Sequence, residues 1–327
     1  MPSLVYKTAQ SIYTKLRRQK NRCLNRLDQP VVVLVYHRVS TLPSDPQILA
    51  VSPENFRAQL QFLKNNFPLV RFEDDWLHLK RPSVAITFDD GYADNALEAL
   101  PILEDMGVPA TFFVSTGSIN TCQEFWWDEL ERVLLGERNY PTSFSLVDHQ
   151  HGKTWPTDSL ARRAALYREL HRLIMRIDSA QREIWIEQLR GWAQIDPMGR
   201  EQNRPLSHAE LRKLAKSPLT TIGAHTVTHT PLSCQSEDRQ REEIILSKRQ
   251  LEELLNIEIR VFSYPFGRKS DYNCTSVRIC REAGFIKSAS NFPGQAHRWS
   301  DPFQVPRQLV RNWETAAFAE AMKGFWV

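Results

Sequence analysis

Cysteine is scarce in this sequence of 327 residues, and its five cysteines are scattered without a Cys-x-x-Cys pair. An odd number at such spacings excludes a disulfide framework and a thiolate zinc site, and it indicates reduced thiols. No stretch approaches the roughly 20 apolar residues that cross a bilayer, which excludes a transmembrane helix. Residues 1–20 also lack the apolar core and the small-residue cleavage site of a signal peptide, so we expect a cytoplasmic protein.

Acidic residues are missing from the beginning of the chain, although the whole sequence carries a net charge of only +4. From Lys7 to Arg26 there are seven basic residues and no acidic one. Residues 1–29 are therefore either a basic amphipathic helix or a solvated basic arm. As a helix, residues 1–28 would contact an anionic membrane surface at the inner membrane face. The rest of the chain is charge-balanced and has no recognition motif, so no nucleic-acid partner is expected.

Short β-branched runs alternate with helical patterns along much of the chain, which is typical of a parallel α/β sheet or barrel. The run from Val31 to Tyr36 is apolar throughout, as expected of a strand buried on both faces. Ser52 and Pro53 form a favoured start for the helix that follows. Strands are predicted at 31–36, 84–88, 110–115, 219–224 and 260–264 and around Phe285 and Phe303, and helices at about 52–67, 96–107, 237–255, 275–283 and 314–322.

The alternation stops between about residues 120 and 205, where the pattern is mostly helical. The charged stretch from Ser159 to Trp192 is predicted to be helical, because leucines recur in it at helical spacing. We therefore expect residues 30–327 to form one α/β body that carries a helical insertion, rather than two catalytic domains.

Adjacent aspartates follow the predicted strand at 84–88, at the position where parallel α/β proteins gather functional groups. Asp89 and Asp90 would repel each other unless a cation or a shared proton intervened. A metal ion would take one as a ligand and leave the other as a base. The alternative is a structural turn, which is our interpretation of the second such pair, Asp74-Asp75, because it follows no strand.

Two histidines follow the predicted strand at 219–224. Spaced four residues apart, the imidazoles of His225 and His229 would face the same side of one helical turn, where they could share a cation. Two histidines and one carboxylate leave a coordination position open for water, as in catalytic metal sites. The alternative is a pair of histidines whose hydrogen bonds are satisfied in a polar loop, and Asp90 at another strand exit argues against it.

Two further strand exits carry candidate residues. Tyr264-Pro265-Phe266-Gly267 follows the strand at 260–264 and is either an ordinary turn or a rigid loop that directs the Phe266 amide N–H toward an oxyanion. His37 directly follows the first strand.

These motifs together resemble those of the polysaccharide deacetylases with a NodB-homology domain, carbohydrate esterase family 4. The family motif Thr-Phe-Asp-Asp-Gly is intact at residues 87–91, and His-Ser/Thr-x-x-His stands at residues 225–229. The resemblance covers roughly residues 30–313 and implies a distorted (β/α)7 barrel. It also implies that Asp89 is the catalytic base. The implied ligands of a divalent metal, with Zn²⁺ favoured over Co²⁺, Ni²⁺ and Mn²⁺, are Asp90, His225 and His229.

Two departures from the family pattern alter the expected roles. Ser263 stands where the family usually has the arginine that orients the catalytic aspartate, and Arg307 is our candidate to replace that arginine. The late Leu-x-His motif, which supplies the general acid, is absent. However, residues 35–39 (Val-Tyr-His-Arg-Val) resemble the opening segment of a branch that includes exopolysaccharide poly-N-acetylglucosamine deacetylases. In that branch an early histidine is the acid, which points to His37; the alternative is a core histidine at a strand end.

The implied activity is metal-dependent removal of an N-acetyl or O-acetyl group from a sugar of a polysaccharide. Because no signal peptide is expected, the substrate would be a lipid-linked or nucleotide-linked precursor in the cytoplasm. One alternative is a catalytically silent carbohydrate-binding protein, which the two departures favour and the complete aspartate and histidine set disfavours. A second alternative is a metal-dependent amidase that acts on a non-sugar amide.

Four tryptophans are candidates for stacking against a sugar ring, although tryptophan more often serves ordinary packing. Trp126 and Trp127 are the better pair, because an insertion at a strand exit is able to cover a site. The other two are Trp299 and Trp313.

Overall fold

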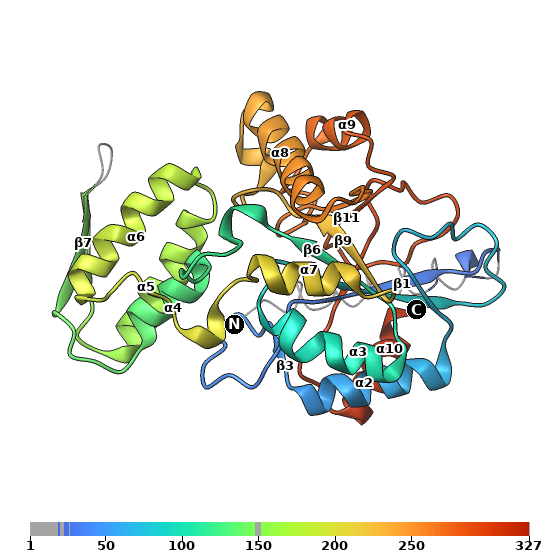
Figure 1. Ribbon diagram of the computed structural model, residues 1–327. Helices are drawn as coiled ribbons and strands as arrows, with labels where there is room; N and C mark the ends of the chain where they lie inside the picture. The colour runs from blue at the N-terminus through green and yellow to red at the C-terminus, as the bar shows by residue number, and fades with distance from the viewer. Residues whose placement is uncertain (1–18, 20–22, 26, 148–151, 327) are drawn as a thin grey trace.

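The computed structural model describes residues 19, 23–25, 27–147 and 152–326, and its centre is a parallel sheet (Figure 1). Seven strands of this sheet lie side by side, and a further short strand, β4 (Leu69–Val70), pairs with β5. This arrangement confirms the predicted α/β class. From one end of the order to the other, the seven are β11 (Lys287–Ala289), β10 (Val261–Ser263), β9 (Thr220–Ala224), β6 (Ala110–Val114), β5 (Ser83–Phe88), β1 (Val31–Tyr36) and β12 (Gln308–Leu309).

The two ends of this strand order meet, so the sheet curls into a distorted barrel as predicted. Just before β12, Val305 forms a parallel bridge with Ala289 of β11. The Ser290 N–H donates to the Val305 carbonyl at 2.8 Å, and the Val305 N–H donates to the Ser288 carbonyl at 3.0 Å. β12 then pairs with β1. The last two strands lie a few residues beyond the positions predicted around Phe285 and Phe303.

The neighbouring strands β1 and β5 end at the same level of the barrel. All residues of both strands are buried, which confirms the interpretation of the apolar run at 31–36. Their register is continuous from Val31↔Ser83 to Tyr36↔Phe88. The residues that follow, His37 and Asp89, therefore leave the sheet at the same level.

Helices cover the outside of the barrel (Figure 1). The helix α2 (Pro53–Asn66) begins as predicted, because Ser52 Oγ accepts the Asn55 N–H at 3.2 Å and Pro53 occupies the first turn. The short strands β2 (Arg38–Val39) and β3 (Ala50–Val51) pair beside it. The remaining helices around the barrel are the π-helical turn η1 (Asn95–Ala99), α3 (Leu100–Met106), the 3-10 turns η2 (Thr116–Ser118) and η4 (Leu232–Cys234), α7 (His208–Lys216), α8 (Glu237–Leu255), α9 (Cys274–Glu282) and α10 (Thr315–Phe325).

The insertion forms a small unit on one side of the barrel, drawn in green to yellow in Figure 1, and its buried apolar residues make a cluster of their own. A pair of antiparallel strands accompanies its helices. The stretch from Ser159 to Trp192 is two helices, because the Asp178 carboxylate accepts the Gln181 N–H at 2.9 Å and caps a new helix. Its elements are α4 (Trp126–Leu135), β7 (Ser143–Val147), β8 (Gly152–Pro156), α5 (Leu160–Ile174), α6 (Ser179–Ala193) and the 3-10 turn η3 (Glu201–Asn203).

The predicted basic arm at residues 1–29 lies mostly outside the described residues, so its helical form and its membrane contact stay predictions. Its described end is attached to the carboxyl-terminal part of the chain. Asn25 Nδ2 donates to the Trp326 carbonyl at 3.0 Å, and Asp28 Oδ2 accepts the Arg298 N–H at 2.7 Å. Within the described ranges, no helix is both long enough and apolar enough to pass through a membrane.

Candidate active site

The carboxyl ends of the barrel strands surround a cavity of about 210 Å³. Asp89 and Asp90 follow β5, His225 follows β9, and His37 follows β1. The structure therefore brings together residues that are up to 188 positions apart in the sequence, as the shared edge of a parallel sheet requires. The predicted site residues that line this cavity are His37, Asp89, Asp90, His225, His229 and Phe266.

A tight turn after β5 presents both aspartates to the cavity. The Asp89 N–H donates to the Tyr36 carbonyl at 3.0 Å, which continues the ladder of β1 and β5 up to the first aspartate. Asp90 then has a φ of 75°, a left-handed conformation that aspartate tolerates better than most residues. Gly91 follows with a φ of 91°, and a Cβ there would lie 2.8 Å from Val114 Cγ1 of β6. This turn therefore requires glycine at position 91.

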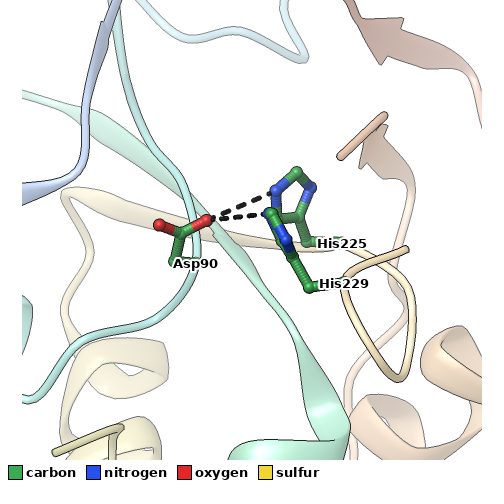
Figure 2. A group of neighbouring side chains, drawn as sticks. All are labelled: Asp90, His225 and His229. Atoms are coloured by element: carbon green, nitrogen blue, oxygen red, sulfur yellow. Dashed lines mark ion pairs between the residues drawn. The ribbon is translucent and has the colours of Figure 1, made fainter. Parts of the chain in front are cut away.

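Asp90, His225 and His229 form a cluster in which each residue offers one ligand atom (Figure 2). Asp90 Oδ1 lies 3.6 Å from His225 Nε2 and 3.2 Å from His229 Nε2. The ligand atoms all lie within 4.8 Å of one another, and the three residues are buried. Two imidazole nitrogens and one carboxylate oxygen are a donor set that suits a divalent metal with an open position.

The loop that carries the two histidines is not the helical turn expected from their spacing, and that expectation was wrong. Thr226 and His229 both have positive φ values, of 64° and 51°, which no helix contains. The His229 N–H donates to Thr226 Oγ1 at 3.1 Å. This left-handed loop, rather than helical periodicity, brings the two imidazoles to the same side of the chain.

Glu243 on α8 holds this loop, and sequence reasoning missed it. Its buried carboxylate accepts the N–H groups of Val227 and Thr228, both at 2.9 Å, and the Thr228 hydroxyl at 2.6 Å. From the insertion, Arg182 donates to the Thr228 carbonyl at 2.8 Å. Glu243 lies on the inward face of the helix, four residues before the buried Ser247, and that burial is evident only in the structure.

Hydrogen bonding and burial determine which atoms of Asp90, His225 and His229 carry protons. His225 Nδ1 lies 2.7 Å from the Ser263 carbonyl, to which it can only donate, so Nε2 keeps its lone pair. Burial raises the pKa of Asp90, but the neighbouring imidazoles of His225 and His229 outweigh that effect and hold the pKa well below its usual range. Burial lowers the pKa of His229. Asp90 and His229 are thus held in the deprotonated forms that bind a metal.

Asp89 forms a buried two-point ion pair with Arg307. Arg307 Nη1 lies 2.7 Å from Asp89 Oδ1, and Nη2 lies 2.5 Å from Oδ2. The guanidinium also donates to Ser263 Oγ at 2.9 Å and to the Ser290 carbonyl at 2.7 Å. The small side chain of Ser263 thus contacts the guanidinium that reaches Asp89. Burial raises the pKa of Asp89, but the positive charge of Arg307 outweighs burial and leaves the pKa below its usual value.

His37 lies in the same cavity as the two aspartates. Its Nδ1 is buried and has no hydrogen-bond partner among the residues that the structure describes. Asn95 Nδ2 donates to the His37 carbonyl at 2.9 Å, which fixes the backbone at the end of β1. Burial lowers the pKa of His37, against the opposite effect of Asp90 and Asp89.

The residues of the Tyr264–Gly267 run have different surroundings. The Tyr264 ring is buried and stacks on Tyr272 with centroids 4.1 Å apart, and the Pro265 carbonyl accepts the Gly267 N–H at 2.6 Å. Phe266 has a φ of 59°, and its ring lies 4.8 Å from that of His229. A Cβ on Gly267 would lie 2.6 Å from the Asn291 nitrogen, so this turn requires glycine as well.

Of the four tryptophans, only Trp127 lines the cavity among the described residues. Its ring lies 4.7 Å from that of His229, and its Nε1 donates to the Tyr92 hydroxyl at 2.7 Å. Trp126 is buried in the insertion, and Trp313 packs against the barrel core. Trp299 is exposed and stacks on His297.

Comparison with known proteins gives consistent results. The family model described as polysaccharide deacetylase matches residues 78–137 and 189–286. Among curated proteins, YxkH of Bacillus subtilis (strain 168), whose name describes a polysaccharide deacetylase, is 22% identical over 302 residues. That match covers 89% of this chain and 76% of YxkH.

Solved structures show the same fold. The deacetylase PplD of Streptococcus pyogenes superposes with a TM-score of 0.57 at 18% identity and covers 90% of this chain and 99% of its own. IcaB of Ammonifex degensii superposes with a TM-score of 0.58 at 20% identity and covers 91% of this chain and 98% of its own.

Proposed function

Because the chain belongs to the polysaccharide deacetylase family, whose members are hydrolases, we propose that it removes N-acetyl groups from a sugar. The sugar would belong to a polysaccharide or to its lipid-linked precursor, and an O-acetyl group is the alternative target. One observation carries this proposal. Asp89, which is paired with Arg307, lines the same cavity as the cluster of Asp90 and the two histidines.

We assign Asp90, His225 and His229 as the ligands of a divalent metal, with Zn²⁺ as the first choice and Co²⁺, Ni²⁺ or Mn²⁺ as alternatives. The hydrogen bond from His225 to the Ser263 carbonyl and the burial of all three residues support this assignment. When bound, such an ion would supply Lewis acidity that polarises the acetyl carbonyl and lowers the pKa of a water.

The side chains around the cluster suit an amide hydrolysis. Asp89 is the proposed base: it would accept a proton from the water that attacks the acetyl carbon, and Arg307 would keep its carboxylate ionised and oriented. In the Tyr264–Gly267 loop, the Phe266 N–H would donate to the developing oxyanion, an interaction worth about 3 kcal/mol in other enzymes. His37 would donate a proton to the leaving nitrogen as the C–N bond breaks. The products are acetate and a free amino sugar.

Metal removal tests this proposal directly. We expect the protein to release acetate from at least one member of a panel of N-acetylated sugars and glycans, and a chelator to stop the release until Zn²⁺ is added back. His229→Ala should lose bound metal and activity together, because it removes one of three ligands. His208→Ala, an exposed histidine on α7, is the matched control and should retain both.

Three results would contradict different parts of the proposal. Acetate release that a chelator does not affect would overturn the metal assignment. Release from non-sugar amides alone would favour an amidase. A protein that retains metal and binds glycans but releases no acetate would favour a carbohydrate-binding function.

Substitution of Glu243 should weaken metal binding without removing a ligand. In Glu243→Ala, the amides of Val227 and Thr228 lose their acceptor, so the left-handed loop that positions His229 is released. We expect the metal affinity to fall by about 10- to 100-fold, the usual effect of losing such a supporting contact. Metal titration measures the change, and Glu242→Ala, whose side chain is exposed on the same helix, is the control. An unchanged affinity in Glu243→Ala would show that the loop holds its shape without this carboxylate.

A further inference from the structure

The insertion forms one wall of the catalytic cavity. Most lining residues come from the barrel, but Trp127 belongs to α4, His171 belongs to α5, and Met175 follows directly after α5. Helix α5 lies within residues 138–188, which the family model leaves unmatched. The barrel thus supplies the proposed base and metal ligands, while α5, which lies outside the family match, supplies another wall of the same cavity.

Aromatic neighbours fix the ring of His171, and its two nitrogens are available for hydrogen bonds with a ligand. Its ring lies 4.9 Å from the Trp126 ring and 6.0 Å from the Tyr167 ring, so aromatic contacts fix its orientation. Within the described ranges, no protein group forms a hydrogen bond with its imidazole. Burial lowers the pKa of His171 to about 4, so near neutral pH its ring has one N–H donor and one acceptor nitrogen.

The wall is anchored to the barrel on the far side of the cavity. Gln47 lines the cavity, and its Nε2 donates to the Tyr167 hydroxyl of α5 at 2.7 Å. Arg311, also in the lining, donates to the Gln47 carbonyl at 3.2 Å. These contacts tie α5 to the loop between β2 and β3, so the position of His171 relative to the barrel is defined.

A second cavity, of about 600 Å³, continues past this wall. It shares Gln47 and His171 with the catalytic cavity and is lined further along α5 by Arg168 and Arg172. His171 therefore stands between the site of acetyl hydrolysis and the space where the remainder of a larger substrate can lie.

We propose that His171 positions the substrate by hydrogen bonding to a hydroxyl group of the acetylated sugar, with Met175 packing beside it as the apolar part of the same wall. This inference rests on the proposed function and narrows the class of substrate, because a non-sugar amide without hydroxyl groups lacks the group that His171 would bind. A site built to bind a hydroxyl group disfavours analogues that lack one, since its polar atoms are then left unpaired. Among the residues that the structure describes, no hydrogen bond or ion pair joins His171 to the metal cluster or to Asp89, so its proposed role is to bind and orient the substrate.

The experiment compares kinetic constants on two acetylated probes, an N-acetylglucosamine oligomer and 4-nitrophenyl acetate, which has no hydroxyl group. For His171→Ala we expect kcat/KM on the sugar to fall about tenfold, mainly through a higher KM, as for loss of one hydrogen bond. Hydrolysis of 4-nitrophenyl acetate and the bound metal should change less than twofold. His171→Asn, whose amide both donates and accepts, should recover part of the loss. Leu173→Ala, exposed on the same helix, is the control.

Binding supplies a second measurement that does not depend on turnover. In an Asp89→Asn background, His171→Ala should raise the Kd for the N-acetylglucosamine oligomer by about tenfold, while Leu173→Ala should not. Equal losses on both probes, or an unchanged KM and Kd for the sugar, would overturn the role of His171 alone. If the unsubstituted protein hydrolyses no acetylated sugar, the proposed function fails, and this inference fails with it.

Discussion

Asp89→Asn should lose nearly all turnover and keep its metal. The substitution preserves the shape of the side chain but removes the lone-pair basicity that the proposed proton transfer needs, so we expect kcat to fall by about 10²- to 10⁴-fold. Asp90 and the two histidines are untouched, and Asp89 Oδ2 is 3.9 Å from His225 Nε2, so the metal ligands should stay in place. Acetate release and metal content, measured on the same sample, test both halves of this expectation.

Asp90→Asn is the matched comparison for Asp89→Asn. It makes the same chemical change at the next residue, but there it alters a proposed metal ligand instead of the proposed base. It should lose metal affinity first and activity as a consequence. Added Zn²⁺ should therefore restore part of the activity of Asp90→Asn and none of that of Asp89→Asn. Full activity in Asp89→Asn would remove Asp89 from the role of base.

Arg307→Gln should both destabilise the fold and move the pH dependence of the reaction. Arg307 is 1% exposed and pairs with Asp89 through two hydrogen bonds. Its loss leaves a buried carboxylate without a counter-charge, so we expect the free energy of unfolding to fall by about 3–5 kcal/mol. Thermal or urea unfolding measures this loss. Arg298→Gln, which removes an exposed guanidinium, is the control and should change stability little.

The direction of the pH effect follows from the two influences on Asp89. Arg307 holds its pKa below the usual value, so the ionised base and the stability of the pair persist above the unfolded pKa and are lost only as the pH falls through the folded pKa. Without Arg307, burial dominates and raises the pKa of Asp89. The acidic limb of kcat/KM should then move to higher pH.

Arg307→Lys keeps the charge but not the two-point geometry, so it should fold and show a smaller shift of the acidic limb. It also keeps the test informative if Arg307→Gln is too unstable to assay. An acidic limb that stays in place in both variants would show that Asp89 is not the group that titrates.

The candidate site divides into a part that the sequence could predict and a part that it could not. Asp89, Asp90, His225 and His37 could be placed together because each follows a predicted strand, and parallel strands end at one edge of a sheet. The conformation of the loop that carries His225 and His229 could not be predicted in this way. Spacing alone suggested a helical turn. In the structure Thr226 and His229 are left-handed, and Glu243 from α8 accepts the N–H groups of the two residues between them, Val227 and Thr228.

The sequence by itself determined the α/β alternation, the buried strands β1 and β5, and the residue types at the strand exits, because periodicity and turn-forming residues act over a few neighbouring positions. Only the tertiary structure decided the contact of Arg307 with Asp89 across 218 positions and the place of His171 in the cavity wall. Such contacts depend on the closure of the barrel and the docking of the insertion, which bring distant segments together and leave no local pattern in the chain.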